Sequence, residues 1–235
     1  MNENSNFETY LLVSPKKFLV SVKKKNNFEN IYQQEKNFEN DLEIVKLDEL
    51  NEFLNENIYK AEKYLDNFIK DINLVLDCNK FFRVQLSLKM NNYGDLLKKK
   101  NLDNLLNEAK NQCRNTLRNK KIIHVVIDNY FVDNKIYKFL PQNLNCNFFS
   151  IDVSFICLPI DFLKPFEVEI NKYQISINRI ISYKYIKELF SNKNLDVIKM
   201  ARDTIRPREA LPSSIHRIKS RVGTSLMRAA VHMRI

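Results

Sequence analysis

Glycine is almost missing from this 235-residue chain, in which only Gly94 and Gly223 occur. Average usage near 7% would give about 16 glycines in a chain of this length. A glycine-rich loop lets backbone N–H groups approach a phosphate closely, and neither the G-x-G-x-x-G nor the G-x-x-x-x-G-K-[ST] pattern is present. The sequence therefore excludes the two common glycine-rich nucleotide loops.

Cysteine is also scarce and is not arranged as sets of metal ligands. The four cysteines, Cys78, Cys113, Cys146 and Cys157, include no C-x-x-C pair and have no adjoining histidine. Zinc sites usually need such closely spaced ligand pairs. We interpret the cysteines as small buried hydrophobic residues and predict no metal site.

Long apolar runs are missing as well. No stretch approaches the roughly 18 consecutive apolar residues of a membrane span, and the first residues, MNENSNFETY, lack the basic start and apolar run of a secretory signal. We therefore expect a cytoplasmic protein. The net charge of +10 is uneven, because residues 201–235 hold +6 of it and residues 1–200 only +4. The small excess of positive charge in residues 1–200 argues against nucleic-acid binding by the whole protein.

Recognisable catalytic groups are few. His124 lies within an apolar strand pattern, where a buried structural histidine is the ordinary interpretation and a general base without a partner motif the rarer one. Asp128 and Asp133 are close in sequence, but aspartates at corners and turns are common. We predict that the chain is not an enzyme, with no catalytic residue and no cofactor-binding residue.

The first part of the chain predicts a hairpin and a long helix. Residues 9–14 and 18–23 read as two short strands joined at Pro15, Lys16 and Lys17. Apolar residues then recur at steps of three and four across residues 47–76, which predicts one continuous amphipathic helix.

The middle of the chain predicts a strand, a helix and two more strands. Apolar and polar residues alternate over residues 81–90, and residues 102–117 form an amphipathic helix with Asn101 as a candidate N-cap. Residues 122–132 read as an interior strand with a bend at Asp128 and Asn129. The alternation changes phase between Phe148 and Phe149, which predicts a bulge or a strand boundary before the strand at 149–157. We expect these three strands in a single sheet, backed by the helix.

The remaining body reads as a helix, a strand and a helix. Pro159 and Pro165 punctuate the chain before a helix end at residues 166–173. A strand at residues 175–181 then leads into a helix at residues 184–200.

This order of elements, together with the segment IIHVVIDNYFVDN at residues 122–134, resembles the insert domain of the FtsA family of actin-like bacterial cell-division proteins. The matching positions are His124, Val125, Tyr130, Val132 and Asp133. The likeness extends over residues 10–190, because the helix at 47–76 precedes the insert and residues 162–190 look like the family's return helix, strand and following helix. It implies an α+β fold, with a strand-helix-strand-strand insert domain on a partial actin-like (ribonuclease H-like) subdomain.

The resemblance also implies what the chain has lost and what it keeps. Where the family has its first phosphate loop, this chain reads Val13-Ser14-Pro15-Lys16-Lys17, with neither aspartate nor glycine. The second phosphate motif has no counterpart, so we expect nucleotide binding to be lost and predict no cofactor. The insert domain implies contacts with other cell-division proteins, with a second copy, or with a filament of the FtsA or FtsZ type.

The last part of the chain has a different composition. Apolar residues from Ile215 to Met233, Ala229 among them, form one stripe on a helical projection, with basic residues elsewhere around it. A basic amphipathic helix on anionic inner-membrane lipid is one interpretation, and the family is known for such a helix. An unstructured or accidental tail, docking of the tail on the core, and an RNA contact are the others. The residues predicted to bind the membrane are Ile215, Arg217, Ile218, Lys219, Arg221, Val222, Leu226 and Arg228.

These observations predict four segments and one function. Residues 1–77 form the first half of the actin-like subdomain, 78–158 the insert domain, 159–200 the return segment, and 201–235 the basic tail. We expect a truncated, non-catalytic cell-division scaffold that is peripheral on the inner membrane at the division site. The alternative is a nucleic-acid-binding protein that acts through its basic tail.

Overall fold

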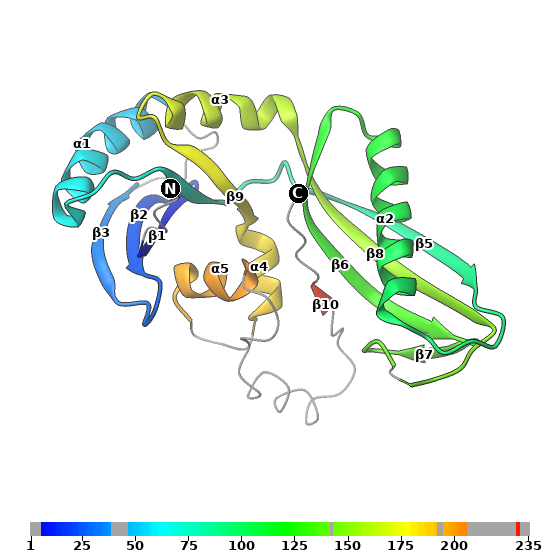
Figure 1. The fold of residues 1–235 in the computed structure, drawn as a ribbon. Coiled ribbons are helices and arrows are strands. Elements are labelled where there is room, and N and C mark those ends of the chain that lie inside the picture. Colours follow the sequence, from blue (N-terminus) through cyan, green and yellow to red (C-terminus); the bar gives the residue numbers. More distant parts are fainter. Residues whose placement is uncertain (1–5, 39–46, 142, 192–194, 206–228, 231–235) are drawn as a thin grey trace. The chain divides into compact units, whose positions relative to one another are not determined.

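The computed structural model describes residues 6–38, 47–141, 143–191, 195–205 and 229–230, and it divides into two units. Unit 1 comprises Met1–Lys80 and Ile160–Arg202, and unit 2 comprises Phe81–Pro159 and Asp203–Ile235. Unit 2 is thus inserted into unit 1 (Figure 1). Both units combine a sheet with helices, which confirms the α+β fold class predicted from the sequence.

Unit 1 is built on a five-stranded mixed sheet in the order β3-β2-β1-β4-β9. Its strands are β1 (Phe7–Val13), β2 (Lys17–Lys24), β3 (Asn30–Asn37), β4 (Asp71–Leu76) and β9 (Ser176–Ser182). Strands β1, β2 and β3 form an antiparallel meander, whereas β4 runs parallel to both β1 and β9. The predicted hairpin of the first two strands is therefore confirmed, and β3, which is largely polar and exposed, was not predicted.

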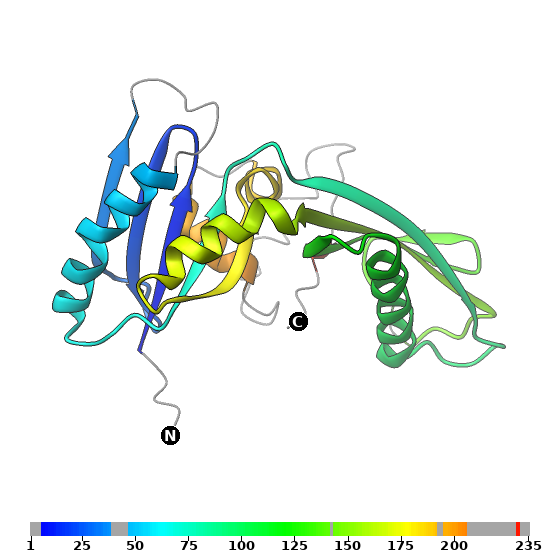
Figure 2. The ribbon, with the colours of Figure 1, turned by 90° about the horizontal axis from the view of Figure 1, so that it is seen from above.

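Helix α1 (Leu47–Leu65) covers β2 and β3 with an apolar stripe that includes Leu50, Leu54 and Ile58. Each such side chain contributes roughly 1.5–3 kcal/mol on full burial. Helix α3 (Ile160–Asn171) packs beside α1 and against β9 (Figure 2). Pro165 lies inside α3, so the helix begins earlier than we predicted. Proline removes only one hydrogen bond there, the one to the carbonyl four residues back.

The prediction of one helix over residues 47–76 is wrong. Helix α1 ends at Leu65, because Asp66 has a φ of 49°, in the left-handed region, and Phe68 is 75% exposed rather than part of a buried stripe. Residues 71–76 instead form β4, which is buried between β1 and β9. A continuous apolar run fits a central parallel strand as well as a helix face, and here the strand pairing decides.

The helix predicted over residues 184–200 is also wrong as a single element. Helix α4 (Tyr183–Leu189) starts at the N-cap Ser182, whose hydroxyl accepts a hydrogen bond from the Tyr185 N–H at 3.4 Å. It ends at Phe190, which leaves the helical conformation with φ −111° and ψ 23°. A separate helix, α5 (Val197–Ile205), follows, and the boundary between the two units falls after Arg202.

Arg202 fixes helix α5 to unit 1. We counted this residue with the basic tail, yet its side chain is only 7% exposed. Its guanidinium lies 3.5 Å from the Glu8 carboxylate, donates to the Lys25 carbonyl and stacks 4.2 Å from the centre of the Phe28 ring. The Glu8 carboxylate matches the charge of this buried guanidinium, and the Lys25 carbonyl accepts a hydrogen bond from one of its N–H groups.

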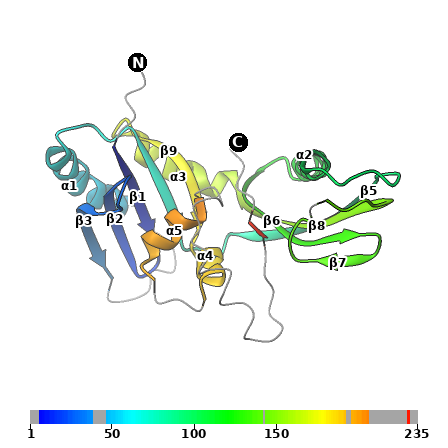
Figure 3. The ribbon, with the colours of Figure 1, turned by 60° about the horizontal axis from the view of Figure 1, so that its bottom comes forward.

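Unit 2 contains one antiparallel sheet in the order β10-β6-β8-β5, with β7 paired to β6. The elements are β5 (Phe82–Asn91), α2 (Lys99–Thr116), β6 (Lys120–Val132), β7 (Lys135–Tyr137), β8 (Phe148–Pro159) and β10 (Ala229–Ala230). Figure 3 shows α2 lying along one face of this sheet. The buried side chains of α2 and the inward residues of β5, β6 and β8 form one core, with Leu106, Phe149 and Phe155 fully buried. The predicted single sheet backed by a helix is confirmed.

Two predicted irregularities of unit 2 are confirmed and one cap is wrong. The register of β6 against β8 shifts between Ile127 and Asn129, at the predicted bend, and β8 begins at Phe148, at the predicted change of phase. Asn101 is not the N-cap of α2. It lies three residues later than the cap residue Lys98 and accepts a hydrogen bond from the Lys98 N–H at 2.9 Å.

Candidate functional site

The carboxyl ends of the parallel strands in unit 1 are the first candidate for a ligand-binding site. In open sheets with parallel strands, ligands usually bind beyond these ends. Here β1 ends at Val13, β4 at Leu76 and β9 at Ser182, and the register pairs Val13 with Leu76 and Leu76 with Ser182. The β1–β2 turn therefore lies next to the residue that follows β4, which is Asp77.

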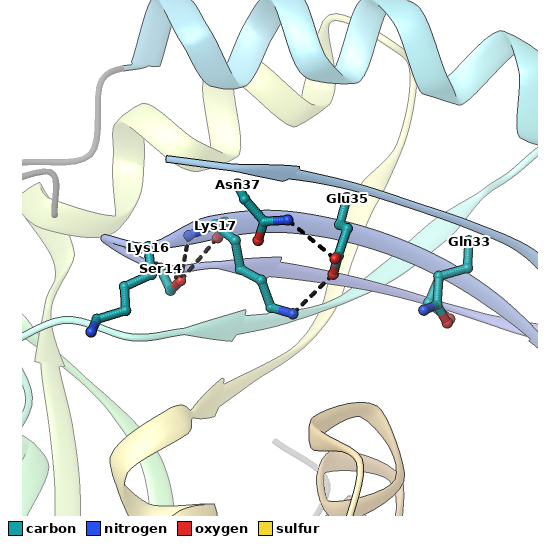
Figure 4. A network of polar contacts seen from close by, with 7 residues as sticks. Ser14, Lys16, Lys17, Gln33, Glu35 and Asn37 are labelled. Atoms are coloured by element: carbon teal, nitrogen blue, oxygen red, sulfur yellow. Dashed lines mark hydrogen bonds and ion pairs between the residues drawn. The ribbon is translucent and has the colours of Figure 1, made fainter. Parts of the chain in front are cut away.

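Ser14 closes the β1–β2 turn with its own side chain (Figure 4). Its hydroxyl oxygen accepts hydrogen bonds from the N–H of Lys17 at 3.0 Å and of Lys16 at 3.3 Å, and it donates to the Lys17 carbonyl at 2.9 Å. The Ser14 N–H also donates to the Lys17 carbonyl. A phosphate loop needs backbone N–H groups that point outward to an anion, whereas in this turn they are satisfied internally.

The neighbouring polar side chains are paired with one another. The Lys17 ammonium lies 2.9 Å from the Glu35 carboxylate, which also accepts a hydrogen bond from the Asn37 amide at 3.2 Å. These contacts, the one with Lys17 first, lower the pKa of Glu35. The arrangement is a polar network on the exposed side of the β2–β3 ladder, and it contains no nucleophile held against a base.

Asp77, the residue that follows β4, has a carboxyl pKa above its ordinary value. Burial raises its pKa, and the nearby charge of Lys16 opposes that shift. The Asp77 N–H donates to the Val13 carbonyl at 2.9 Å, which holds the residue beside the turn. Our sequence reasoning missed Asp77 because it assigned the preceding residues to a helix. A short run of apolar residues followed directly by aspartate is the signal that indicates the end of a buried parallel strand.

The candidate residues of unit 2 have separate structural partners. His124 is 2% exposed within β6, as the structural interpretation requires. Asp133 follows β6 in the left-handed region, and its carboxylate accepts hydrogen bonds from the N–H groups of Asn147 and Phe148. Asp128 accepts a hydrogen bond from the Ser154 hydroxyl. The two aspartates thus serve a bulge and a turn, and are not joined in one site.

One end of the unit 2 sheet carries a group of exposed apolar side chains, which we call the apolar tip. It is defined by five of the nine large hydrophobic residues that are exposed among the described ones: Tyr93, Leu96, Ile136, Phe139 and Phe148. Strand pairing brings them to the same end of the sheet, because Asn91 pairs with Phe148, Val132 pairs with both Phe149 and Lys135, and Leu96 pairs with Asn145. Our sequence reasoning did not identify these residues as one surface, since they come from separate segments of the chain.

The loops of the apolar tip are held by internal hydrogen bonds. Asp133 and Asn134, with φ values of 44° and 68°, form the two-residue turn between β6 and β7. Asn92 donates from its amide to the Asp95 carbonyl at 2.6 Å and accepts from the Asn101 amide at 2.9 Å. The Gly94 N–H donates to the Cys146 carbonyl. The β6–β7 turn and the β5–α2 loop are therefore preformed parts of the tip, which lowers the entropy lost on binding.

The described part of the chain holds neither a group of metal ligands nor a membrane-spanning helix. In those residues no group of three histidine, cysteine or acidic side chains could hold a metal ion, and the four cysteines are free thiols. Over the same ranges, no helix has both the length and the apolar character needed to cross a membrane. The eight residues predicted to bind the membrane, from Ile215 to Arg228, lie outside the described residues.

Ala229, which we placed on the apolar stripe of the tail, is not helical. Ala229 and Ala230 form the strand β10, which pairs with Ile127 and Val126 of β6. The edge of β6 offers backbone donors and acceptors to an extended segment at this point, and Ala229 and Ala230 pair there instead of being helical.

Comparisons with known proteins give similarity to solved structures only. No protein-family model matches the chain, and no curated protein matches it. The structure is similar to the cytoplasmic domain of EpsL, an inner membrane component of the type II secretion system of Vibrio cholerae. The two chains are 10% identical, the match covers 77% of this chain and 57% of that one, and the TM-score is 0.34.

Two further solved structures are similar at the same level. A Bacteroides thetaiotaomicron protein with an actin-like ATPase fold and unknown function has 14% identity over 79% of this chain and 56% of its own, at a TM-score of 0.36. The PilM–PilN type IV pilus biogenesis complex gives 8% identity over 76% and 48%, at a TM-score of 0.44. This chain spans about half the length of these structures. The resemblance to FtsA stays a prediction from the sequence.

Proposed function

We propose that the chain is a non-catalytic scaffold protein, in which a partial actin-like unit carries a recognition unit that contacts other proteins at the cytoplasmic face of a membrane. The observation that carries the proposal is the β1–β2 turn of unit 1. At the position where an actin-like protein would hold phosphate, Ser14 occupies the backbone donors of Lys16 and Lys17. The sheet order of unit 1, a meander extended by two parallel strands, supports the actin-like assignment.

The apolar tip of unit 2 supports the protein-contact part of the proposal. Exposed apolar groups that gather in one place commonly mark interaction sites in soluble domains. Aromatic residues are also enriched where proteins meet, and three of the five residues of the tip are aromatic. A preformed tip with large side chains is suited to insertion into a pocket of a partner.

The finer form of the proposal places the protein in cell division. It depends on the resemblance of residues 122–134 to the FtsA insert domain, and on the basic tail as a contact with anionic lipid. Under this proposal the partners are other cell-division proteins, which bind to unit 2, and unit 1 is the domain into which unit 2 is inserted.

Fluorescence imaging of the tagged protein in dividing cells tests this function. We expect discrete signal at the division site, which the double variant Ile136→Ser/Phe139→Ser makes diffuse because it removes two apolar contacts of the tip. The matched control, Tyr59→Ser/Val168→Ser, changes two exposed residues of unit 1 and should leave the signal in place. Signal away from the division site would contradict the cell-division form, and equal loss in both variants would contradict the role of the tip.

Liposome flotation tests the membrane part separately. The full chain should float with anionic vesicles and not with neutral ones, and deletion of residues 213–235 should abolish flotation. If the full chain instead binds RNA or DNA with a steep dependence on salt, and the deletion removes that binding, the nucleic-acid alternative replaces the scaffold proposal.

A further inference from the structure

The two edges of the unit 2 sheet differ in how they are protected. Along β6, the register shifts twice, between Ile122 and His124 and between Ile127 and Asn129, and both β7 and β10 pair with parts of the strand. Bulges and short covering strands are standard ways in which proteins block an edge from pairing with another chain.

Strand β5, at the opposite edge, shows none of these protections within the described residues. All ten of its residues, Phe82–Asn91, pair with β8 in one uninterrupted register, and among the described strands it pairs with β8 alone. It contains no proline and no acidic residue. A long, regular edge strand is a template for strand addition, in which a peptide extends the sheet through main-chain hydrogen bonds.

The side chains of β5 suit such an addition on both faces. Phe82, Val84, Leu86 and Met90 pack on the core of unit 2 but remain only partly buried, so an added strand would cover them. The other face alternates Arg83, Gln85, Ser87 and Lys89, and the two cations are six residues apart. A strand with apolar residues at every second position and acidic residues at a spacing of six would match both faces.

The charge of unit 2 indicates what kind of chain binds there. Residues 81–159 contain twelve lysine and arginine residues against six aspartate and glutamate residues, whereas unit 1 contains nineteen against twenty. Two copies that meet edge to edge at β5 would bring two basic units together, which is unfavourable. A partner segment with acidic residues would instead be attracted.

We propose that β5 is the docking site for an extended, acidic segment of a protein partner, which adds to the unit 2 sheet as an antiparallel strand. The inference rests on the proposed scaffold function, because it names the way in which unit 2 holds its partner. The apolar tip lies at the end of β5, so both features can face one partner.

A designed peptide tests the docking site directly. The probe is Thr-Val-Glu-Val-Thr-Val-Thr-Val-Glu-Val with a terminal fluorophore, which places its two glutamates opposite Lys89 and Arg83 in an antiparallel ladder. Fluorescence anisotropy with the full chain should show saturable binding that weakens as NaCl is raised from about 50 mM to about 300 mM. A second peptide with lysine in place of both glutamates should bind at least about tenfold more weakly.

Protein variants locate the site. Lys89→Glu should weaken binding of the acidic peptide about tenfold and strengthen binding of the lysine peptide, because it reverses one charge on β5. The matched control Lys135→Glu reverses the charge of another exposed strand lysine, on β7, and should leave both affinities within about twofold. Equal effects of the two variants would overturn the assignment to β5.

Backbone pairing is tested with N-methylated peptides. Successive N–H groups of a strand point to opposite sides, so only every second one can bond to β5. Methylation of one alternate set should abolish binding, and methylation of the other set should not. Equal loss with both sets would overturn strand addition.

The remaining outcomes separate this inference from the scaffold function. A dimer in sedimentation equilibrium that Lys89→Glu dissociates would show that a second copy occupies the edge, and would overturn the acidic partner. If the peptide does not bind while the chain still localises through its tip, the docking site is refuted and the scaffold function stands. If the peptide binds but the cellular signal is diffuse, the docking site stands and the scaffold function is refuted.

Discussion

Replacing Ser14 with alanine removes the side chain that closes the β1–β2 turn of unit 1. The hydroxyl takes part in three hydrogen bonds, with Lys17 N–H at 3.0 Å, Lys16 N–H at 3.3 Å and the Lys17 carbonyl at 2.9 Å. A net hydrogen bond contributes about 0.5–1.5 kcal/mol, and the long contact from Lys16 contributes least. Ser14 is only 5% exposed, so the freed Lys17 N–H regains little solvation from water. We therefore expect Ser14→Ala to lower the free energy of unfolding by about 2 kcal/mol.

Urea unfolding followed by far-UV circular dichroism measures this loss, since the chain has no tryptophan to report by fluorescence. Ser14→Thr retains the hydroxyl and should recover at least half of the loss. Ser191→Ala, at an exposed serine after α4, should change stability by less than about 0.5 kcal/mol. If Ser14→Ala destabilises the protein no more than Ser191→Ala does, the turn does not depend on its serine.

Three further changes probe the core, the α5 contact and a buried thiol. Leu106→Ala should cost about 3 kcal/mol in urea unfolding, because this α2 residue is fully buried in the core of unit 2; a cost under about 1 kcal/mol would contradict that packing. Arg202→Gln should cost about 2 kcal/mol by the same assay, because it leaves Glu8 without its cation; an unchanged midpoint would show that α5 does not depend on this contact. Burial, and to a lesser extent the neighbouring Cys113, raises the pKa of the Cys157 thiol from 9.0 to about 12. Between pH about 9 and 12 the thiol therefore ionises only in the unfolded protein, so the free energy of unfolding should fall as the pH rises. Cys157→Ala should show a smaller loss between pH about 9 and 10.5, and identical pH profiles would refute the shift.

The fold was predictable from sequence where one periodicity dominates. The strict alternation of β5, the apolar stripe of α2 and the change of phase at Phe148 each predicted the element or boundary that the structure has. Prediction failed where the same residues fit both a helix and a buried strand. Residues 71–76 continue the helical spacing of α1, and only their pairing with β1 and β9, which are distant in the chain, makes them a strand.

The contacts of the candidate site could not be predicted from the sequence. The first turn has neither glycine nor aspartate, and from this we predict that it does not hold phosphate. That Ser14 satisfies the turn depends on a side-chain rotamer, and no residue pattern specifies one. The apolar tip is assembled from the β5–α2 loop, β7, the residues after β7 and the start of β8, so only the strand registers reveal it.

Equilibrium binding of Mg-ATP to the full chain, measured by isothermal titration calorimetry, tests the central claim that unit 1 has a closed turn in place of a phosphate loop. We expect no saturable heat up to millimolar nucleotide, for the protein as isolated and for Ser14→Ala alike. Saturable binding with micromolar affinity would contradict it, because the backbone donors of Lys16 and Lys17 would then have to leave Ser14 for a phosphate.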